Sequence, residues 1–372
     1  MNIHIANSAT ETFIFIFVLT CLLFLSLRPK EKNDDNIIPQ KVTQELKGFA
    51  ILAVVFSHIG YYLVDDKMFL FPLSIMAGVG VNLFLLLSGF GLSSSLSNNK
   101  KQPVKYFYSH ELPKLYIPLW YTLCFYIFFD FIKKIIYSPT TIIESFLGFF
   151  PQANLYKDIN SPLWYFTLIL FYYLLFPIVF NKKYPWLSAL GIFITSFFLI
   201  SNLLPLSSQV INLYTVHMAA FPIGMCLYWL TSKKQVKKII KLLSTKITEG
   251  FYLALISTLI FIIFYSALNS YVGQVVYKEQ FISIFTSLCI FTLFTIKKNI
   301  FRLFSIFGLY SYEIYLIHWP LMYRYNFLYS HFNPWLATVF YLCVFVCFGW
   351  ILKKISNYTI VTIKVFLLRF LY

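Results

Sequence analysis

The stretch that decides the fold reads Lys47-Gly48-Phe49-Ala50-Ile51-Leu52-Ala53-Val54-Val55-Phe56-Ser57-His58. An apolar run of this kind is typical of a helix that crosses a membrane. It ends in a histidine, and an ionisable side chain inside such a helix is costly and usually functional. Any chemistry of this chain is therefore expected within the bilayer, with His58 as the first candidate residue.

The whole chain shares the composition of that stretch. Hydrophobic residues make up 59% of it and charged residues only 12%, whereas about a quarter of a soluble domain is charged. Eleven segments are apolar over close to the 20 residues that a span needs: 11–27, 48–64, 70–92, 115–132, 162–180, 186–203, 211–231, 251–268, 280–296, 303–321 and 334–352. We predict an all-α, polytopic membrane helix bundle with about eleven transmembrane helices.

Basic residues gather in alternate loops between these segments. With the N-terminus placed outside, 24 of the 30 Lys and Arg residues fall in the inner loops and six in the outer ones. Cytoplasmic loops carry an excess of Lys and Arg, so we predict a cytoplasmic C-terminus. The net charge of +16 then reflects topology in a lipid bilayer, and no nucleic-acid partner is expected.

Two loops stand out from the others. The longest outer loop, 133–161, carries Glu144, Asp158 and several aromatic residues, which would anchor it at the interface or stack on a sugar ring. The inner segment 232–249 is strongly basic and could form an amphipathic helix on anionic lipid. The six cysteines all lie in apolar stretches without metal spacing, so neither disulfides nor a metal site is expected.

On one helix, Lys47 and His58 stand about 16 Å apart, which places Lys47 at the cytoplasmic edge and His58 deep in the membrane. Burial favours a neutral imidazole, which can act as a general base. The alternative is a structural histidine whose ring is satisfied by a carbonyl or hydroxyl. Glu313 is the only acid deep in a predicted span, and it would lie near His58, bind substrate or join two helices.

Other polar residues in the spans are weaker candidates. His318 and Trp319 precede Pro320 at the outer end of a span, where such residues are often structural. Asn82 could hydrogen-bond His58 or a carbonyl oxygen, and His217 is a weaker candidate for a functional residue than either. The small residues in the same predicted span as Asn82 would permit close helix packing: Gly78, Gly80, Ser88, Gly89 and Gly91.

Five segments together resemble the acyltransferase 3 family of membrane O-acyltransferases, in the family's order from about 45 to 325. They are Lys47 to His58 (basic-x10-His), Gly80-Val81-Asn82-Leu83-Phe84 to Phe90, Tyr106-Phe107 to Pro118, Ser161-Pro162-Leu163-Trp164, and Ser311-Tyr312 to His318-Trp319-Pro320. The resemblance implies two parts, an extra transmembrane anchor with a cytoplasmic linker in 1–46 and an acyltransferase-like membrane domain in 47–372.

The resemblance further implies transfer of an acyl group, expected to be acetyl from acetyl-CoA, to a sugar hydroxyl of a surface polysaccharide or its lipid-linked precursor. No cofactor is expected to stay bound, since acyl-CoA is a substrate, and the chain would lie in the cell (inner, cytoplasmic) membrane. By family, His58 would be catalytic, and Glu313 is placed beside it as a catalytic candidate because it is an acid deep in a predicted span. The expected donor-binding residues are Lys47, Lys105 and Lys114, and the expected substrate-binding residues are Asn82, Trp164, Tyr315 and His318.

The sequence departs from the family pattern at three positions. Lys47 stands where arginine is usual, Glu111-x-x-Lys114 replaces R-x-x-R, and Asn82 replaces an aspartate. The second change bears on donor affinity, because that element is thought to meet the acyl-CoA phosphates. Two other functions remain open: a polysaccharide flippase or transporter, and a glycan polymerase or ligase.

Overall fold

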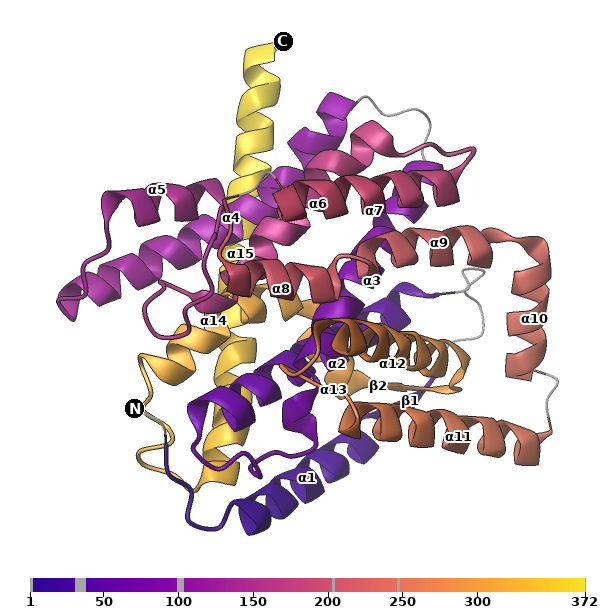
Figure 1. The fold of residues 1–372 in the computed structure, drawn as a ribbon, viewed down its shortest axis with the longest axis horizontal. Coiled ribbons are helices and arrows are strands. Elements are labelled where there is room, and N and C mark those ends of the chain that lie inside the picture. The colour runs from indigo at the N-terminus through magenta and orange to yellow at the C-terminus, as the bar shows by residue number, and fades with distance from the viewer. Residues whose placement is uncertain (1–2, 31–37, 99–103, 203–204, 246–247, 372) are drawn as a thin grey trace.

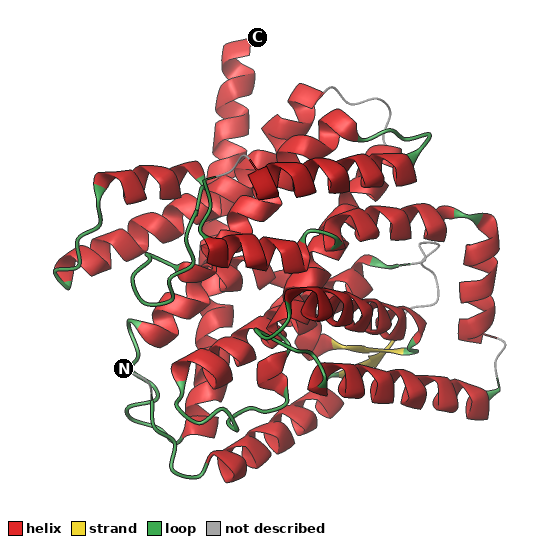
Figure 2. Ribbon diagram, viewed as in Figure 1, coloured by secondary structure: helices red, strands yellow, loops and turns green. Residues whose placement is uncertain are grey.

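The computed structural model describes residues 3–30, 38–98, 104–202, 205–245 and 248–371. Figure 2 shows that these residues are almost entirely helical, with one two-stranded ribbon. The predicted all-α, polytopic membrane architecture is confirmed. Residues 31–37 of the predicted linker lie outside the described part of the chain.

The elements follow one another along the chain in Figure 1. The helices are α1 (Ser8–Leu25), α2 (Gln40–Ser57), η1 (His58–Leu63), η2 (Leu73–Ile75), α3 (Ala77–Asn98), α4 (Val104–Ile132), α5 (Pro139–Leu147), η3 (Ser161–Leu163), α6 (Trp164–Val179), α7 (Pro185–Asn202), α8 (Ser208–His217), α9 (Ala220–Ser232), α10 (Lys234–Thr245), α11 (Glu249–Leu268), α12 (Val276–Ile296), α13 (Arg302–Leu309), α14 (Ser311–Tyr323) and α15 (Pro334–Leu371). The strands are β1 (Leu27–Pro29) and β2 (Asn299–Phe301).

Among the described residues, nine of the eleven predicted segments correspond to helices long and apolar enough to cross a membrane. The segment 186–203 corresponds to a shorter apolar helix, Pro185–Ile200. The prediction that a span begins at residue 70 was wrong, since α3 begins at Ala77. Leu70 adopts a left-handed backbone with φ of 59°, which a continuous right-handed helix cannot contain.

The predicted single span 303–321 is also wrong, because the chain breaks into α13 and α14 at Tyr310. α13 packs closely across α2 at a pair of glycines. A Cβ atom on Gly308 would lie 1.7 Å from the Gln44 carbonyl oxygen, and one on Gly48 would lie 1.8 Å from the Phe304 oxygen. The two backbones thus touch, which only glycine permits.

A second glycine pair joins α3 to α9. A Cβ on Gly89 would lie 2.2 Å from the Phe221 oxygen, and one on Gly224 would lie 2.1 Å from the Leu86 oxygen. The predicted close packing of small residues on α3 is confirmed here, whereas Gly91 has no such neighbour within 4 Å. These two crossings fix α2 and α3 at the centre of the bundle.

Loops assigned to the same side of the membrane lie together. On the predicted inner side, β1 pairs antiparallel with β2, and Glu45 accepts hydrogen bonds of 2.5 Å from both Lys297 Nζ and the Phe301 amide. On the predicted outer side, the Ile3 amide donates to the Leu63 carbonyl oxygen at 2.9 Å. Each of these contacts joins two segments that the alternation of loops assigns to the same side of the membrane.

The basic segment 232–249 contains α10, which joins α9 to α11. In Figure 1, α10 runs across the ends of these two helices at the right-hand edge of the bundle. That placement agrees with the predicted amphipathic helix on a lipid surface. Residues 246 and 247 of the segment lie outside the described chain.

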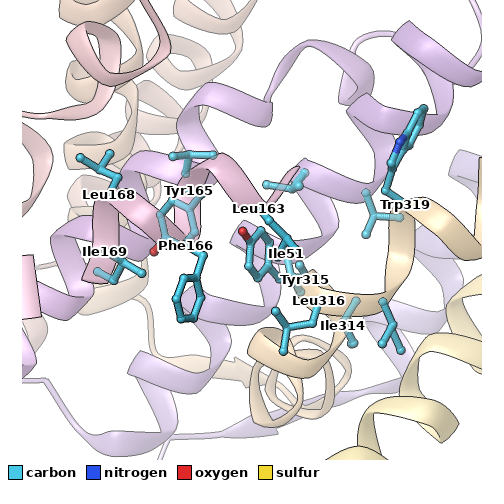
Figure 3. Packing of buried hydrophobic residues seen from close by; sticks show 14 of the residues in the cluster. Ile51, Leu163, Tyr165, Phe166, Leu168, Ile169, Ile314, Tyr315, Leu316 and Trp319 are labelled. Carbon is cyan, nitrogen blue, oxygen red and sulfur yellow. The ribbon is translucent and has the colours of Figure 1, made fainter. Parts of the chain in front are cut away.

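The hydrophobic core around the candidate site is built by α2, α6 and α14. Figure 3 shows Ile51 beside Tyr315 and Leu316, with Phe166 and Ile169 of α6 on the other side. These side chains are at most 7% exposed. The three helices consequently pack on one another through the part of α2 that precedes His58.

Replacing Gly308 by valine is expected to deplete the folded protein from the membrane. The new side chain would overlap the α2 backbone, and neither helix can move away without opening the core. The expected result is at least a severalfold loss of detergent-extracted monodisperse protein, measured by size-exclusion chromatography. Gly91→Ala is the matched control and should leave the yield unchanged; equal yields for both variants would contradict the crossing.

Candidate active site

His58 lies where α2 changes its winding. The α-helix ends at Ser57, and residues His58–Leu63 form a π-helical turn, a feature that is frequent at functional sites. The Nδ1 atom of His58 is 2.9 Å from the Val54 carbonyl oxygen. Every residue from Ala50 to Gly60 is buried except His58, so part of its ring is accessible.

His318 of α14 is the partner that the structure brings to His58. Its Nε2 atom lies 3.3 Å from His58 Nδ1, and the ring centroids are 4.9 Å apart. The side chain of His318 is fully buried. A residue expected to bind substrate is therefore a neighbour of the candidate base.

The hydrogen bonds assign the tautomers of both rings. His318 Nδ1 lies 2.9 Å from the Tyr315 oxygen and 3.1 Å from the Ile314 oxygen, which can only accept, so Nδ1 carries the hydrogen. His318 Nε2 is then an acceptor. His58 Nδ1 correspondingly donates to the Val54 oxygen and to His318 Nε2, which leaves a lone pair on His58 Nε2.

Aromatic rings line the outer side of this pair. The ring of Trp319 lies 5.3 Å from that of His58, and the ring of Tyr62 lies 5.8 Å away. Trp319 Nε1 donates to the Leu155 carbonyl oxygen at 2.9 Å, which ties the outer loop to α14. The site is thus apolar around a single basic nitrogen.

Glu313 does not meet His58 in any contact described for it. It lies in the first turn of α14, where its charge interacts with those of Lys353 and Lys47. His318 follows five residues later, about 7.5 Å further along the helix. The hypothesis that Glu313 lies near His58 is not supported, because the face of α14 that meets His58 presents His318 instead.

Asn82 likewise does not contact His58; it belongs to a second polar cluster. Its Oδ1 atom lies 2.8 Å from His217 Nδ1, and its amide nitrogen donates to Ser283 Oγ at 2.9 Å. The Trp164 ring stacks on His217 with centroids 5.6 Å apart. These contacts tie α3, α8 and α12 together, with Trp164 of α6 stacked on the cluster.

The remaining predicted residues occupy separate places. Tyr315 is buried, and its hydroxyl donates to the Pro162 oxygen at 2.8 Å. Lys105 is exposed at the start of α4, and Lys114 is paired with Glu111 at 2.9 Å. No contact described in the structure joins these two lysines to Lys47.

Sequence reasoning missed Lys353, a residue of α15. Its charge interacts with those of Lys47 and Glu313, and its Nζ atom donates to the Leu309 carbonyl oxygen. The only signal was its position at the inner end of the last apolar segment. Two lysines and one carboxylate therefore interact at the predicted cytoplasmic end of the site.

A family model described as an acyltransferase domain, that of the acyltransferase 3 family, matches residues 46–354. No curated protein and no solved structure matches the chain significantly. The matched range contains the contacting pair His58 and His318, and also Lys47, Glu313 and Lys353.

Proposed function

This chain belongs to the acyltransferase 3 family, and from that premise we propose that it is a membrane O-acyltransferase using His58 as its general base. The proposed reaction moves acetyl from acetyl-CoA to a sugar hydroxyl of a cell-surface polysaccharide or its lipid-linked precursor. The observation that carries the proposal is the free lone pair of His58 Nε2, fixed by the hydrogen bonds of Nδ1. The protein would act in the cytoplasmic membrane of the cell.

In the proposed mechanism, His58 Nε2 removes the proton from the acceptor hydroxyl as its oxygen attacks the thioester carbonyl. The new ester bond forms, the carbon–sulfur bond breaks, and the CoA thiolate leaves. His58 then returns the proton to that thiolate. While the ring is protonated, its Nδ1–H still donates to Val54 O and His318 Nε2, which hold its orientation.

The donor would enter from the cytoplasmic side. Lys47 lies about 16 Å from His58 along α2, close to the length over which an extended thioester arm can reach inward. Lys47, Lys105 and Lys114 would attract the CoA phosphates, and Lys353 would add to the charge around Lys47. Glu313 would offset part of the positive charge of Lys47 and Lys353 and would orient these two side chains.

Replacing Glu111 by glutamine is expected to strengthen donor binding. Glu111 pairs with Lys114 at 2.9 Å and also lies 2.8 Å from His110 Nδ1, so it withdraws charge from the helix that would meet the phosphates. Exposed pairs of this kind contribute up to about 1 kcal/mol, which corresponds to roughly a fivefold lower KM for acetyl-CoA. Steady-state kinetics should give an unchanged kcat; a raised KM would contradict the role of Lys114.

NMR of the host's purified surface polysaccharide, with and without the gene, tests the proposed function. Loss of the O-acetyl signals from an otherwise intact polymer would support it and identify the modified hydroxyl. Unchanged acetylation with a collapse in polymer amount or chain length would favour the transporter or polymerase instead. No change in either would exclude a polysaccharide acceptor.

A further inference from the structure

A cavity of about 100 Å³ with both polar and apolar lining lies on the predicted outer side, between α5 and the loop that follows it. It is smaller than the roughly 300 Å³ of a typical drug-sized site, so it suits one small polar unit. Its lining combines carboxylates, amides and aromatic rings: Glu144, Phe149, Phe150, Gln152, Asp158 and Asn160. None of these residues belongs to the His58 site.

The local sequence builds this cavity as a fixed structure. Ser138 caps α5 by accepting from the Thr141 amide at 3.1 Å, and Gly148 ends the helix with a positive φ of 78°. The chain then turns towards α6, where Thr167 Oγ1 accepts from the Phe150 amide at 2.8 Å. Thr167 also donates to the Gly148 oxygen at 3.0 Å, so both ends of the turn are held by one side chain.

Asn160 supplies an unsatisfied acceptor at the wall of the cavity. Its side chain is only 2% exposed, and its amide nitrogen donates to the Leu316 oxygen at 2.7 Å. No group in the described part of the protein hydrogen-bonds its Oδ1 atom. A buried acceptor without a partner is costly, so the Asn160 amide would gain a hydrogen bond by turning its Oδ1 atom towards a ligand donor in the cavity.

The rest of the lining fits a ligand rich in hydroxyl groups. Asp158 accepts from the Asn154 amide at 2.7 Å, and burial raises the pKa of this carboxyl group. Glu144 and Gln152 add further acceptors, while Phe149 and Phe150 offer apolar surface. Hydrogen-bond acceptors beside aromatic rings match a sugar, which has hydroxyl donors at its edge and C–H groups on its faces.

The cavity is connected to the candidate active site through α14. Leu316, which accepts from Asn160, stands two residues before His318. Arg324, which caps the C-terminal end of α14, donates to the Asp158 carbonyl oxygen at 2.7 Å and to the Ile159 carbonyl oxygen at 3.2 Å. It also forms an ion pair with the buried Asp130. One helix thus positions both the cavity and the partner of His58.

We propose that this cavity is a second sugar subsite, which binds a different residue of the acceptor glycan from the one whose hydroxyl reaches His58. The inference rests on the proposed function and names where its acceptor is held. The subsite would make an oligosaccharide a better acceptor than a monosaccharide, because two sugar residues would be bound at once.

The test uses the full-length protein in detergent and oligosaccharide fragments of the host's de-O-acetylated surface polysaccharide. Glu144→Gln and Phe149→Ala are compared with Asp65→Asn, a matched change of an exposed outer-loop carboxylate that does not line the cavity. We expect the KM for the fragments to rise about tenfold in Glu144→Gln, as for loss of one charged hydrogen bond. It should also rise in Phe149→Ala, which removes apolar surface on which the C–H face of a sugar would pack. The KM for acetyl-CoA should stay unchanged, and Asp65→Asn should behave as wild type.

Saturation-transfer NMR of the fragments separates this inference from the proposed function. If wild type transfers no acetyl group but binds the fragments, and Glu144→Gln loses the binding, the subsite holds and the reaction does not. Equal binding and equal KM in wild type, Glu144→Gln and Phe149→Ala would overturn the subsite. Fragment binding that disappears with a calcium chelator in all variants alike would also overturn it, since the cavity would then hold a cation.

Discussion

Replacing His58 by alanine should lower acetyl transfer by a factor of about 10² to 10⁴, the usual contribution of a general base. The variant is expected to keep the helices in place, because His58 is the one residue between Ala50 and Gly60 that is not fully buried. What it loses is the Nε2 lone pair that would accept the proton of the hydroxyl. Transfer to oligosaccharide, measured with radiolabelled acetyl-CoA, gives the rate, and extraction from membranes gives the protein level.

A second histidine serves as the control for this experiment. His331 lies in an exposed loop, where its Nδ1 atom contacts Ser330 and the Phe327 oxygen, so His331→Ala should keep full activity. His58→Gln should be as inactive as His58→Ala, since an amide can hydrogen-bond but cannot take up the proton. Full activity of either His58 variant at normal membrane level would remove His58 from the mechanism.

Replacing His318 by alanine should lower kcat by roughly 10- to 100-fold, the effect usual for a group that orients a reactive imidazole. His318 is a positioning residue here, because its Nε2 atom acts on His58 Nδ1 and not on the substrate. The KM values for donor and acceptor should therefore stay close to those of wild type. Steady-state kinetics with both substrates varied measures this split.

A conservative variant distinguishes positioning from packing. His318→Gln places an amide oxygen near the former Nε2 atom, so it should recover part of the kcat that His318→Ala loses. A rise in the acceptor KM with unchanged kcat would instead assign His318 to substrate binding, as the sequence predicted. A loss of both variants from the membrane would assign it to the core, where its side chain is fully buried.

The sequence predicted the fold class and the positions of most helices because apolar length is a local property. It could not place the breaks, since these depend on contacts between distant segments. Gly308 and Gly48 are 260 residues apart along the chain, and their contact accompanies the division of 303–321 into α13 and α14. The predicted span begins at residue 70, but α3 begins only at Ala77. Leu70 has a left-handed backbone, and a leucine in the sequence gives no sign of that conformation.

The candidate site was predictable only in part for the same reason. His58 was visible as an ionisable residue in an apolar run, and the family match from residue 46 to 354 includes it. Its neighbour was not predictable, because Glu313 and His318 lie on one helix and only packing decides which of them faces α2. The same limit applies to Asn82, whose partner His217 lies 135 residues away.

The most direct test of the account is acetyl transfer by the purified full-length protein. Radiolabelled acetyl-CoA and the de-O-acetylated surface polysaccharide are supplied, and label in the polymer and free CoA are both counted. The proposed mechanism predicts equal amounts of ester and CoA from wild type, and amounts of both that are lower by about 10² to 10⁴ in His58→Ala. Equal rates from wild type and His58→Ala, or CoA release by wild type without label in the polymer, would contradict it.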